Sequence, residues 1–255
     1  MTEDEKYLFD LQGFLLVKQA ISADVLSVMN LWIEEREKEA PEWRNNYPSI
    51  LAWGLPFQNL LDNDKILPYL VELMGDELRL DHDYAIFAKG DTPGGGLHGG
   101  SSPYDPAQYY HNYRGRMYSG LTVASYALTD ALMEDGGFAC IPGSHKASFP
   151  LPSHYHSLDN PTAVVMRVPV QAGDCVLFTE ALTHGTLPWK AEHQRRNLFL
   201  KYSPKHLSWA DRYYYPAEGN SVTRLLENKL TDNQRALLAP PSVHNHPQVH
   251  LHSAG

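Results

Sequence analysis

The segment AVVMRVPVQAGDCVLFTE (residues 163–180) decides the fold class of this chain of 255 residues. It contains two short apolar runs separated by the turn residues Gly173 and Asp174, as expected for two β-strands with a tight connection. Clusters of Gly, Pro and Asp separate similar runs elsewhere in the chain. The pattern predicts a mainly β protein, a jelly-roll-like antiparallel double sheet whose interior can hold a ligand. The other runs are LRLDHDYAIFAK (78–89), MYSGLTVASYALTD (117–130), GFACIPGSH (137–145) and RRNLFLKYSP (195–204).

Helices are expected on both sides of this β region in the sequence. Residues 13–40, GFLLVKQAISADVLSVMNLWIEEREKEA, predict a short strand and then a helix beginning after Ser22, with Val25, Leu26, Met29 and Trp32 at helical spacing. The segment after residue 229 predicts one short helix and then an end rich in Pro and His. We expect a single domain over residues 1–255, with its core at about 78–204, a helical flank at 1–77 and an extension at 205–255.

The composition narrows the classes of partner. A formal net charge of -9 argues against a nucleic-acid polymer or an anionic membrane as the main partner, although local cations can still bind a small anion. Two cysteines are too few for a disulfide framework, and no apolar run is long enough to cross a bilayer. We therefore expect a cytoplasmic protein that acts on a small molecule; the sequence does not indicate its oligomeric state.

Among the 13 histidines, His98 and His184 have a distinctive context. His184 follows the strand-like run GDCVLFTEAL, and His98 lies in the glycine-rich segment GDTPGGGLHGGSSPYDP (90–106). Two neutral imidazoles at strand ends inside a barrel are a common way to hold iron, and a downstream arginine can bind a dicarboxylate. Each histidine alone is more commonly an ordinary hydrogen-bonded residue. Loop or tail positions account for six others, His154, His156, His244, His246, His250 and His252.

The segment GGFACIPGSHKASFP (136–150), followed by GDCVLFTEALTHGTLPW (173–189) and RRNLFLKYSP, resembles the phytanoyl-CoA dioxygenase family of iron(II)/2-oxoglutarate oxygenases. The resemblance extends from GFLLVKQAIS (13–22) to about residue 204. It implies a double-stranded β-helix, a jelly roll of the cupin type with flanking helices, and Fe(II), 2-oxoglutarate and O2 as cofactor and cosubstrates. It also implies that His184 is the distal iron ligand and that Arg195 and Thr186 bind 2-oxoglutarate. Arg196 is the alternative to Arg195, because a register error of one residue exchanges their faces.

The carboxylate that completes the iron site in this family is missing from its usual place. Hydroxylating members carry His-x-Asp or His-x-Glu, but no histidine of this chain has an acid two positions later. With His98 as the proximal ligand, the acidic position is Gly100. Halogenases that resemble this chain have His-x-Gly or His-x-Ala, and chloride binds at the vacancy. The resemblance therefore implies a halogenase with chloride beside Gly100 and with Ser101 as a possible donor to the halide.

Two alternatives stay open at this point. An acid from elsewhere, such as Asp83 or Asp105, could reach the iron and restore a hydroxylase. The barrel could also have lost catalysis and serve as a binding module for a small molecule. His145, in the Pro-Gly-Ser-His turn, is more readily explained as structural than as a ligand.

The segment SSPYDPAQYYHNYRGRMYSG (101–120) follows the proximal histidine, so we expect it to lie at the mouth of the barrel. Its tyrosines can stack on a planar group, and cations in or near it can neutralise an anion. The His-Gly-Gly turn and the chain length also resemble a nucleotide halogenase of the family. That resemblance implies a purine deoxynucleotide such as deoxyadenosine monophosphate, chlorinated on its sugar. The candidate substrate-binding residues are Tyr109, Tyr110, Tyr113, His111, Arg114, Arg116 and Lys89.

Overall fold

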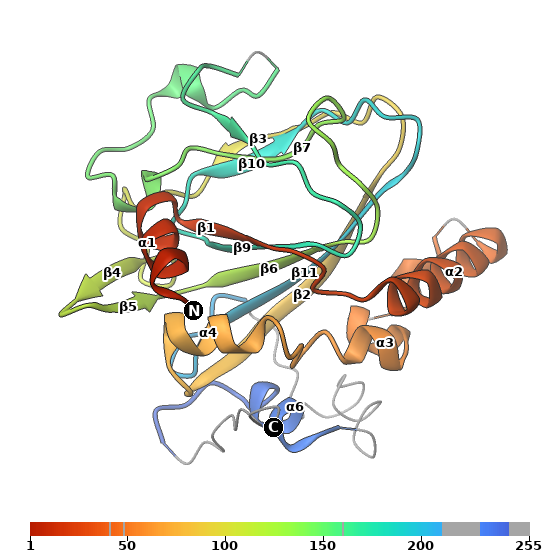
Figure 1. The fold of residues 1–255 in the computed structure, drawn as a ribbon, viewed down its shortest axis with the longest axis horizontal. Helices are drawn as coiled ribbons and strands as arrows, with labels where there is room; N and C mark the ends of the chain where they lie inside the picture. The colour runs from red at the N-terminus through yellow and green to blue at the C-terminus, as the bar shows by residue number, and fades with distance from the viewer. Residues whose placement is uncertain (41, 48, 160, 211–229, 245–255) are drawn as a thin grey trace.

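The computed structural model describes residues 1–40, 42–47, 49–159, 161–210 and 230–244. Two antiparallel sheets face each other in it (Figure 1). The larger has the strand order β1-β9-β6-β11-β2 and the smaller the order β3-β10-β7-β8, while β4 and β5 form a separate hairpin. The prediction of a mainly β protein with antiparallel sheets and flanking helices is confirmed. The described strands are β1 (Phe14–Val17), β2 (Leu78–Ala88), β3 (Gly95–His98), β4 (Tyr110–Tyr113), β5 (Arg116–Ser119), β6 (Thr122–Ala127), β7 (Gly137–Cys140), β8 (Met166–Arg167), β9 (Cys175–Thr179), β10 (His184–Leu187) and β11 (Arg195–Pro204).

Strand β11 shows how the larger sheet separates two apolar layers. All ten of its residues are buried, because β6 and β2 pair with its two edges and both of its faces are covered. Leu198 and Leu200 belong to the core shared with the helices, whereas Phe199 belongs to the core between the sheets. Alternation along a strand therefore directs Arg195, like Phe199, toward the inside, and Arg196 toward the helices.

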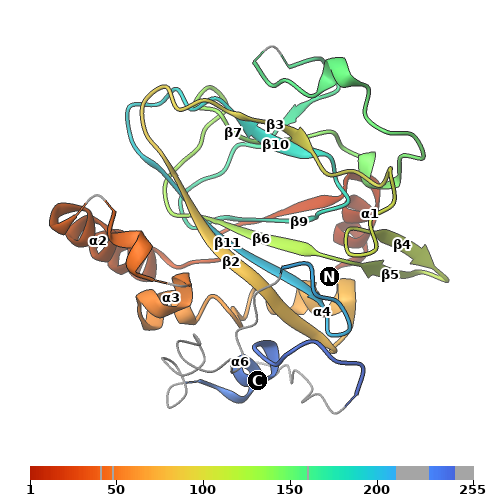
Figure 2. The same cartoon turned by 180° about the vertical axis from the view of Figure 1, so that it is seen from behind.

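Helices cover the outer face of the larger sheet and one end of the molecule (Figure 2). The predicted strand at residues 14–17 and the helix after Ser22 are both present, although the Ser22 side chain makes no capping hydrogen bond. The predicted short C-terminal helix is α6. Helix α1 was not predicted; its Thr2 forms a capping box with Glu5. The helices are α1 (Glu3–Gln12), α2 (Ala23–Glu39), α3 (Leu55–Gln58), α4 (Leu67–Met74) and α6 (Asp232–Leu237), with short 3-10 turns at Trp43–Asn46, Ile50–Trp53, Ser144–Lys146 and Ser153–Tyr155.

Two expectations concern the ends of the chain and the membrane. Within the described ranges, no helix is long and apolar enough to span a bilayer. The His-rich end is described only as far as His244, so His246, His250 and His252 lie outside the described residues.

Candidate active site

His98 and His184 meet between neighbouring strands of the smaller sheet. His98 ends β3 and His184 begins β10, and the two residues are partners in the antiparallel register. Their ring centroids are 4.3 Å apart, with the ring planes inclined at 58°. The two histidines that are 86 positions apart in the sequence thus form one pair.

The hydrogen bonds of the pair select one tautomer. The Nδ1 atoms of His98 and His184 lie 3.0 Å and 2.8 Å from the carbonyl oxygens of Gly96 and Leu182, so each Nδ1–H donates to the backbone. Each Nε2 then carries the free lone pair that a metal requires. Burial lowers the pKa of His184 to about 4, so this imidazole is neutral at pH 7. The pair therefore has the chemistry of two metal-binding imidazoles.

Apolar rings surround the buried member of the pair. The ring centroid of Phe178 on β9 lies 4.7 Å from that of His184, and the ring of Phe138 on β7 lies at 6.1 Å. Both phenylalanines are part of the apolar layer between the sheets. His98 is more exposed than His184, so the pair is shielded on the His184 side and open to solvent on the His98 side.

Arg195 is a buried cation with unused hydrogen-bonding capacity. Its Nε donates to Asn197 Oδ1 at 2.9 Å, while its Nη1 has no partner among the described residues. Burial lowers the pKa of Arg195 to about 10. A buried guanidinium with a free donor is suited to a carboxylate ligand. Thr186 lies two residues after His184 and pairs with Phe138, so alternation places its side chain on the same face as His184.

Arg196 lies on the opposite face, as its register requires. Its Nη1 contacts Glu34 at 3.3 Å and its Nη2 contacts Glu37 at 3.2 Å, both on α2. Arg196 thus attaches α2 to the outside of the sheet. Of the two candidate 2-oxoglutarate arginines, the structure places only Arg195 in the layer that contains the histidine pair.

The backbone conformation of the turn after His98 accounts for glycine at position 100, where the resemblance implies an acid. Gly99 and Gly100 both adopt positive φ, +75° and +109°, a conformation in which side chains are strained. A Cβ at Gly100 would also approach Thr183 Oγ1 to 3.0 Å. The Ser101 hydroxyl donates to the carbonyl of Ala147 and so contacts backbone. The turn is thus built around glycine.

The two acids considered as substitutes have other partners. Asp83 accepts hydrogen bonds from the Ser49 hydroxyl at 2.9 Å and the Ile50 N–H at 2.6 Å. Asp105 accepts from the N–H of Ala107 at 2.7 Å. In the part of the chain that the structure describes, no three His, Cys, Asp or Glu side chains are arranged to hold a metal ion.

Glu180 is the acid that the sequence analysis missed. It follows β9, is only 4% exposed, and its carboxylate lies 2.6 Å from the ammonium of Lys201 on β11. Burial alone would raise the pKa of Glu180, but the ion pair with the Lys201 ammonium helps to hold it below its usual value. Glu180 precedes His184 by four residues, which is not the His-x-Asp or His-x-Glu spacing, and the acids named from the sequence were Asp83 and Asp105. A buried acid thus lies on the turn that leads to His184, and its backbone oxygen and the His184 ring both approach Gly99.

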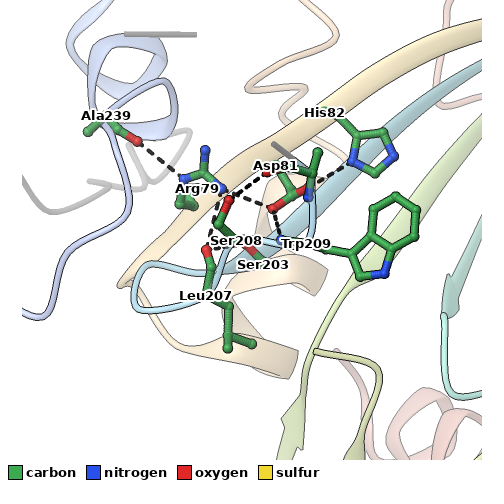
Figure 3. Close-up of polar contacts among 9 residues, drawn as sticks. Arg79, Asp81, His82, Ser203, Leu207, Ser208, Trp209 and Ala239 are labelled. Carbon is green, nitrogen blue, oxygen red and sulfur yellow. Dashed lines mark hydrogen bonds and ion pairs between the residues drawn. The ribbon is translucent and has the colours of Figure 1, made fainter. Parts of the chain in front are cut away.

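An aromatic surface lies next to Lys201. The Lys201 ammonium is 5.5 Å from the ring centroid of Tyr84 and 5.8 Å from that of Trp209, and Trp209 stacks on His82 at 5.3 Å. Asp81 fixes this arrangement, because it accepts the Trp209 N–H at 2.9 Å and contacts His82 Nδ1 at 2.8 Å (Figure 3). Arg79 supports Asp81 through an ion pair of 3.1 Å.

The residues of the predicted substrate segment make contacts of their own in the structure. Tyr110 is buried, donates its hydroxyl to Asp10 at 2.7 Å and packs on His145, so both have structural contacts. Tyr109 stacks on His111 at 5.4 Å, and burial raises the pKa of Tyr109. The remaining cations and rings are exposed: Arg114 lies over Tyr113, Arg116 lies over Tyr118, and Lys89 follows Ala88 at the end of β2.

Comparisons with known proteins show the family and the fold. The family profile of phytanoyl-CoA dioxygenase (PhyH) matches residues 59–197, more than half of the chain. Among curated proteins, no significant match is found.

Three solved structures, of two proteins, illustrate the similarity. HygX from Streptomyces hygroscopicus, with nickel and 2-oxoglutarate bound, has a TM-score of 0.74 and 26% identity, covering 82% of this chain and 89% of HygX. The same protein has been solved with nickel, 2-oxoglutarate and hygromycin B, at a TM-score of 0.72 and the same identity and coverage. SnoK, an alpha-ketoglutarate-dependent carbocyclase from nogalamycin biosynthesis, shares the fold at 18% identity, a TM-score of 0.56 and coverage of 81% and 85%.

Proposed function

The chain belongs to the phytanoyl-CoA dioxygenase family, and on that premise we propose that it is an Fe(II)/2-oxoglutarate-dependent enzyme that oxidises a C–H bond of a free small molecule. The proposed scaffold is a double-stranded β-helix formed by the two facing sheets. The observation that carries the proposal is the pair of imidazoles, His98 and His184. The Nδ1–H of each donates to a backbone carbonyl, and both lie in the same layer as the buried Arg195, which has a free N–H donor.

The residues fit both cosubstrate and metal. His98 and His184 would hold Fe(II) through Nε2, and Arg195 would bind the distal carboxylate of 2-oxoglutarate, with Thr186 adding a hydroxyl donor. When bound, the iron and 2-oxoglutarate supply the oxidising power: O2 is reduced as 2-oxoglutarate loses CO2 and becomes succinate, and a substrate C–H bond is oxidised. HygX contains nickel and 2-oxoglutarate together, which supports the same pairing here.

The protein groups around the site have separate tasks. Phe178 and Phe138 exclude water from the His184 side and keep that ring in one orientation. The carbonyls of Gly96 and Leu182 hold the two imidazoles in the metal-binding tautomer. Arg195 is kept in place by Asn197, so its fork is preorganised for the dicarboxylate.

The substrate side is proposed to be the surface of His82, Tyr84, Lys201 and Trp209. Trp209 is 49% exposed and its backbone is held by Asp81, so its ring is available for stacking. This surface suits a ring-containing polar molecule. HygX has been solved with hygromycin B bound, so hygromycin B is one test compound, and a purine deoxynucleotide such as deoxyadenosine monophosphate is the other.

Chlorination is the second candidate outcome. It is favoured by one observation: in the described ranges, only two imidazoles and no third ligand are arranged for metal binding, and Gly100 takes the acidic position. Chloride would then supply the missing negative charge.

Turnover with Fe(II), O2 and 2-oxoglutarate tests the proposal. We expect succinate to form, and mass spectrometry of the coupled product distinguishes a hydroxyl group or desaturation from chlorine. Succinate formation that is independent of iron, or its absence with iron loaded, would contradict the proposal and leave a binding module.

A further inference from the structure

The turn between β9 and β10 brings Glu180 beside the histidine pair. The backbone oxygen of Glu180 would lie 2.8 Å from a Cβ at Gly99, and His184 Nδ1 would lie 3.4 Å from the same point. The residue after His98, the backbone of Glu180 and the ring of His184 therefore share one small volume. The Glu180 side chain is buried, and its carboxylate contacts the Lys201 ammonium at 2.6 Å.

A buried carboxylate at this place has to be explained. A carboxylate removed from water costs several kcal/mol unless a cation compensates it. In the structure, the Lys201 ammonium is the cation that compensates the Glu180 carboxylate. A divalent ion held by two neutral imidazoles needs a negative ligand in the same region, and the backbone at Gly100 cannot carry one without strain.

We propose, on the basis of the proposed function, that Glu180 is the third protein ligand of the iron and that its carboxylate transfers from Lys201 to the metal on metal binding. The glutamate side chain has three rotatable bonds, so a rotamer change moves its carboxylate while the backbone stays at the Gly99 turn. Lys201 keeps two favourable neighbours after the transfer, the rings of Tyr84 and Trp209. It also becomes free to meet an anionic group of the substrate.

Metal affinity separates this role from a purely structural ion pair. Residues that merely support metal ligands change affinity about 10–100-fold when mutated, so the loss of a direct ligand should cost on the order of 100-fold. We expect Glu180→Gln to weaken anaerobic Fe(II) or Co(II) binding by that factor in calorimetry. The matched variant Lys201→Met removes the competing cation and should bind the metal as tightly as the wild type or more tightly.

Chloride gives a second, independent measurement. In the wild type with Fe(II) and 2-oxoglutarate, the visible charge-transfer band should not respond to chloride, because Glu180 occupies the third position. In Glu180→Ala the band should shift with chloride. If Glu180→Gln does not fold, Glu180→Asp keeps the charge opposite Lys201 but shortens the reach, and the same loss of affinity is expected.

Each other result overturns the inference. Equal weakening in Glu180→Gln and Lys201→Met would show a structural ion pair, and unchanged affinity in both would exclude Glu180 from the metal. A wild-type band that already shifts with chloride would refute the inference while the proposed function stands, with chlorination favoured. No metal binding by the folded wild type would overturn the proposed function as well.

Discussion

Replacement of Arg195 by Gln should separate ligand binding from fold stability. Burial lowers the pKa of Arg195 to about 10, well below its ordinary value, which corresponds to at most about 3 kcal/mol by which burial disfavours the charged form. Gln at this position removes the buried charge and can still contact Asn197. We therefore expect the ligand-free variant to be as stable as the wild type or up to about 3 kcal/mol more stable.

The same substitution should abolish most of the stabilisation by 2-oxoglutarate. Truncating one member of a buried charged pair costs about 2–5 kcal/mol, so Kd should rise at least about 30-fold. At a 2-oxoglutarate concentration near 100 times the wild-type Kd, the ligand stabilises the wild type by about 2.7 kcal/mol and the variant by less than about 1 kcal/mol.

Urea unfolding with Ni(II), with and without 2-oxoglutarate, measures both effects. Arg196→Gln is the matched control, because Arg196 contacts Glu34 and Glu37 on α2 and should keep the full ligand effect. Full ligand stabilisation in Arg195→Gln, or its loss in Arg196→Gln, would refute the assignment of Arg195.

Three further changes test separate parts of the structure. Burial lowers the pKa of His145 to about 4, so the folded state binds fewer protons than the unfolded state between about pH 6.5 and 4. Between pH 7 and 5 the unfolding free energy of the wild type should therefore fall by about 2 kcal/mol more than that of His145→Gln. Equal losses in the two proteins would contradict this explanation. Gly100→Asp and Gly100→Ala should each destabilise the fold by about 1–3 kcal/mol, because φ is +109° and the added Cβ approaches Thr183. A melting temperature equal to that of the wild type would exclude this strain. Trp209→Ala should raise the KM for substrate and leave substrate-free metal binding unchanged, and a KM equal to that of the wild type would exclude Trp209 from the substrate surface.

The long strands were predictable from the sequence, and so was the family motif at residues 136–150, 173–189 and 195–204. Apolar or alternating runs in β2, β6, β9 and β11 carry a strong strand signal, whereas their order in the sheet was not predicted. Strands β3 and β10 have only four residues each and are rich in glycine, so their pairing was not predictable. That pairing is what brings His98 to His184.

The part of the site that was missed depends on the path of one turn. Glu180 resembles any acid at a strand end until the chain between β9 and β10 folds back against Gly99. The burial of Tyr110 against Asp10 likewise depends on helix α1, whose short polar sequence did not predict a helix. Local patterns and the family resemblance therefore selected His98 and His184, and tertiary contacts decided which loop residues lie near them.

The central claim is that the two imidazoles and Arg195 bind Fe(II) and 2-oxoglutarate together. The most direct measurement is anaerobic addition of Fe(II) and 2-oxoglutarate to the metal-free protein, followed by visible spectroscopy. We predict a charge-transfer band that needs both additions, is lost in His184→Ala and is reached only at much higher 2-oxoglutarate in Arg195→Gln. A folded wild-type protein that shows no band, or an undiminished band in His184→Ala, would contradict the account.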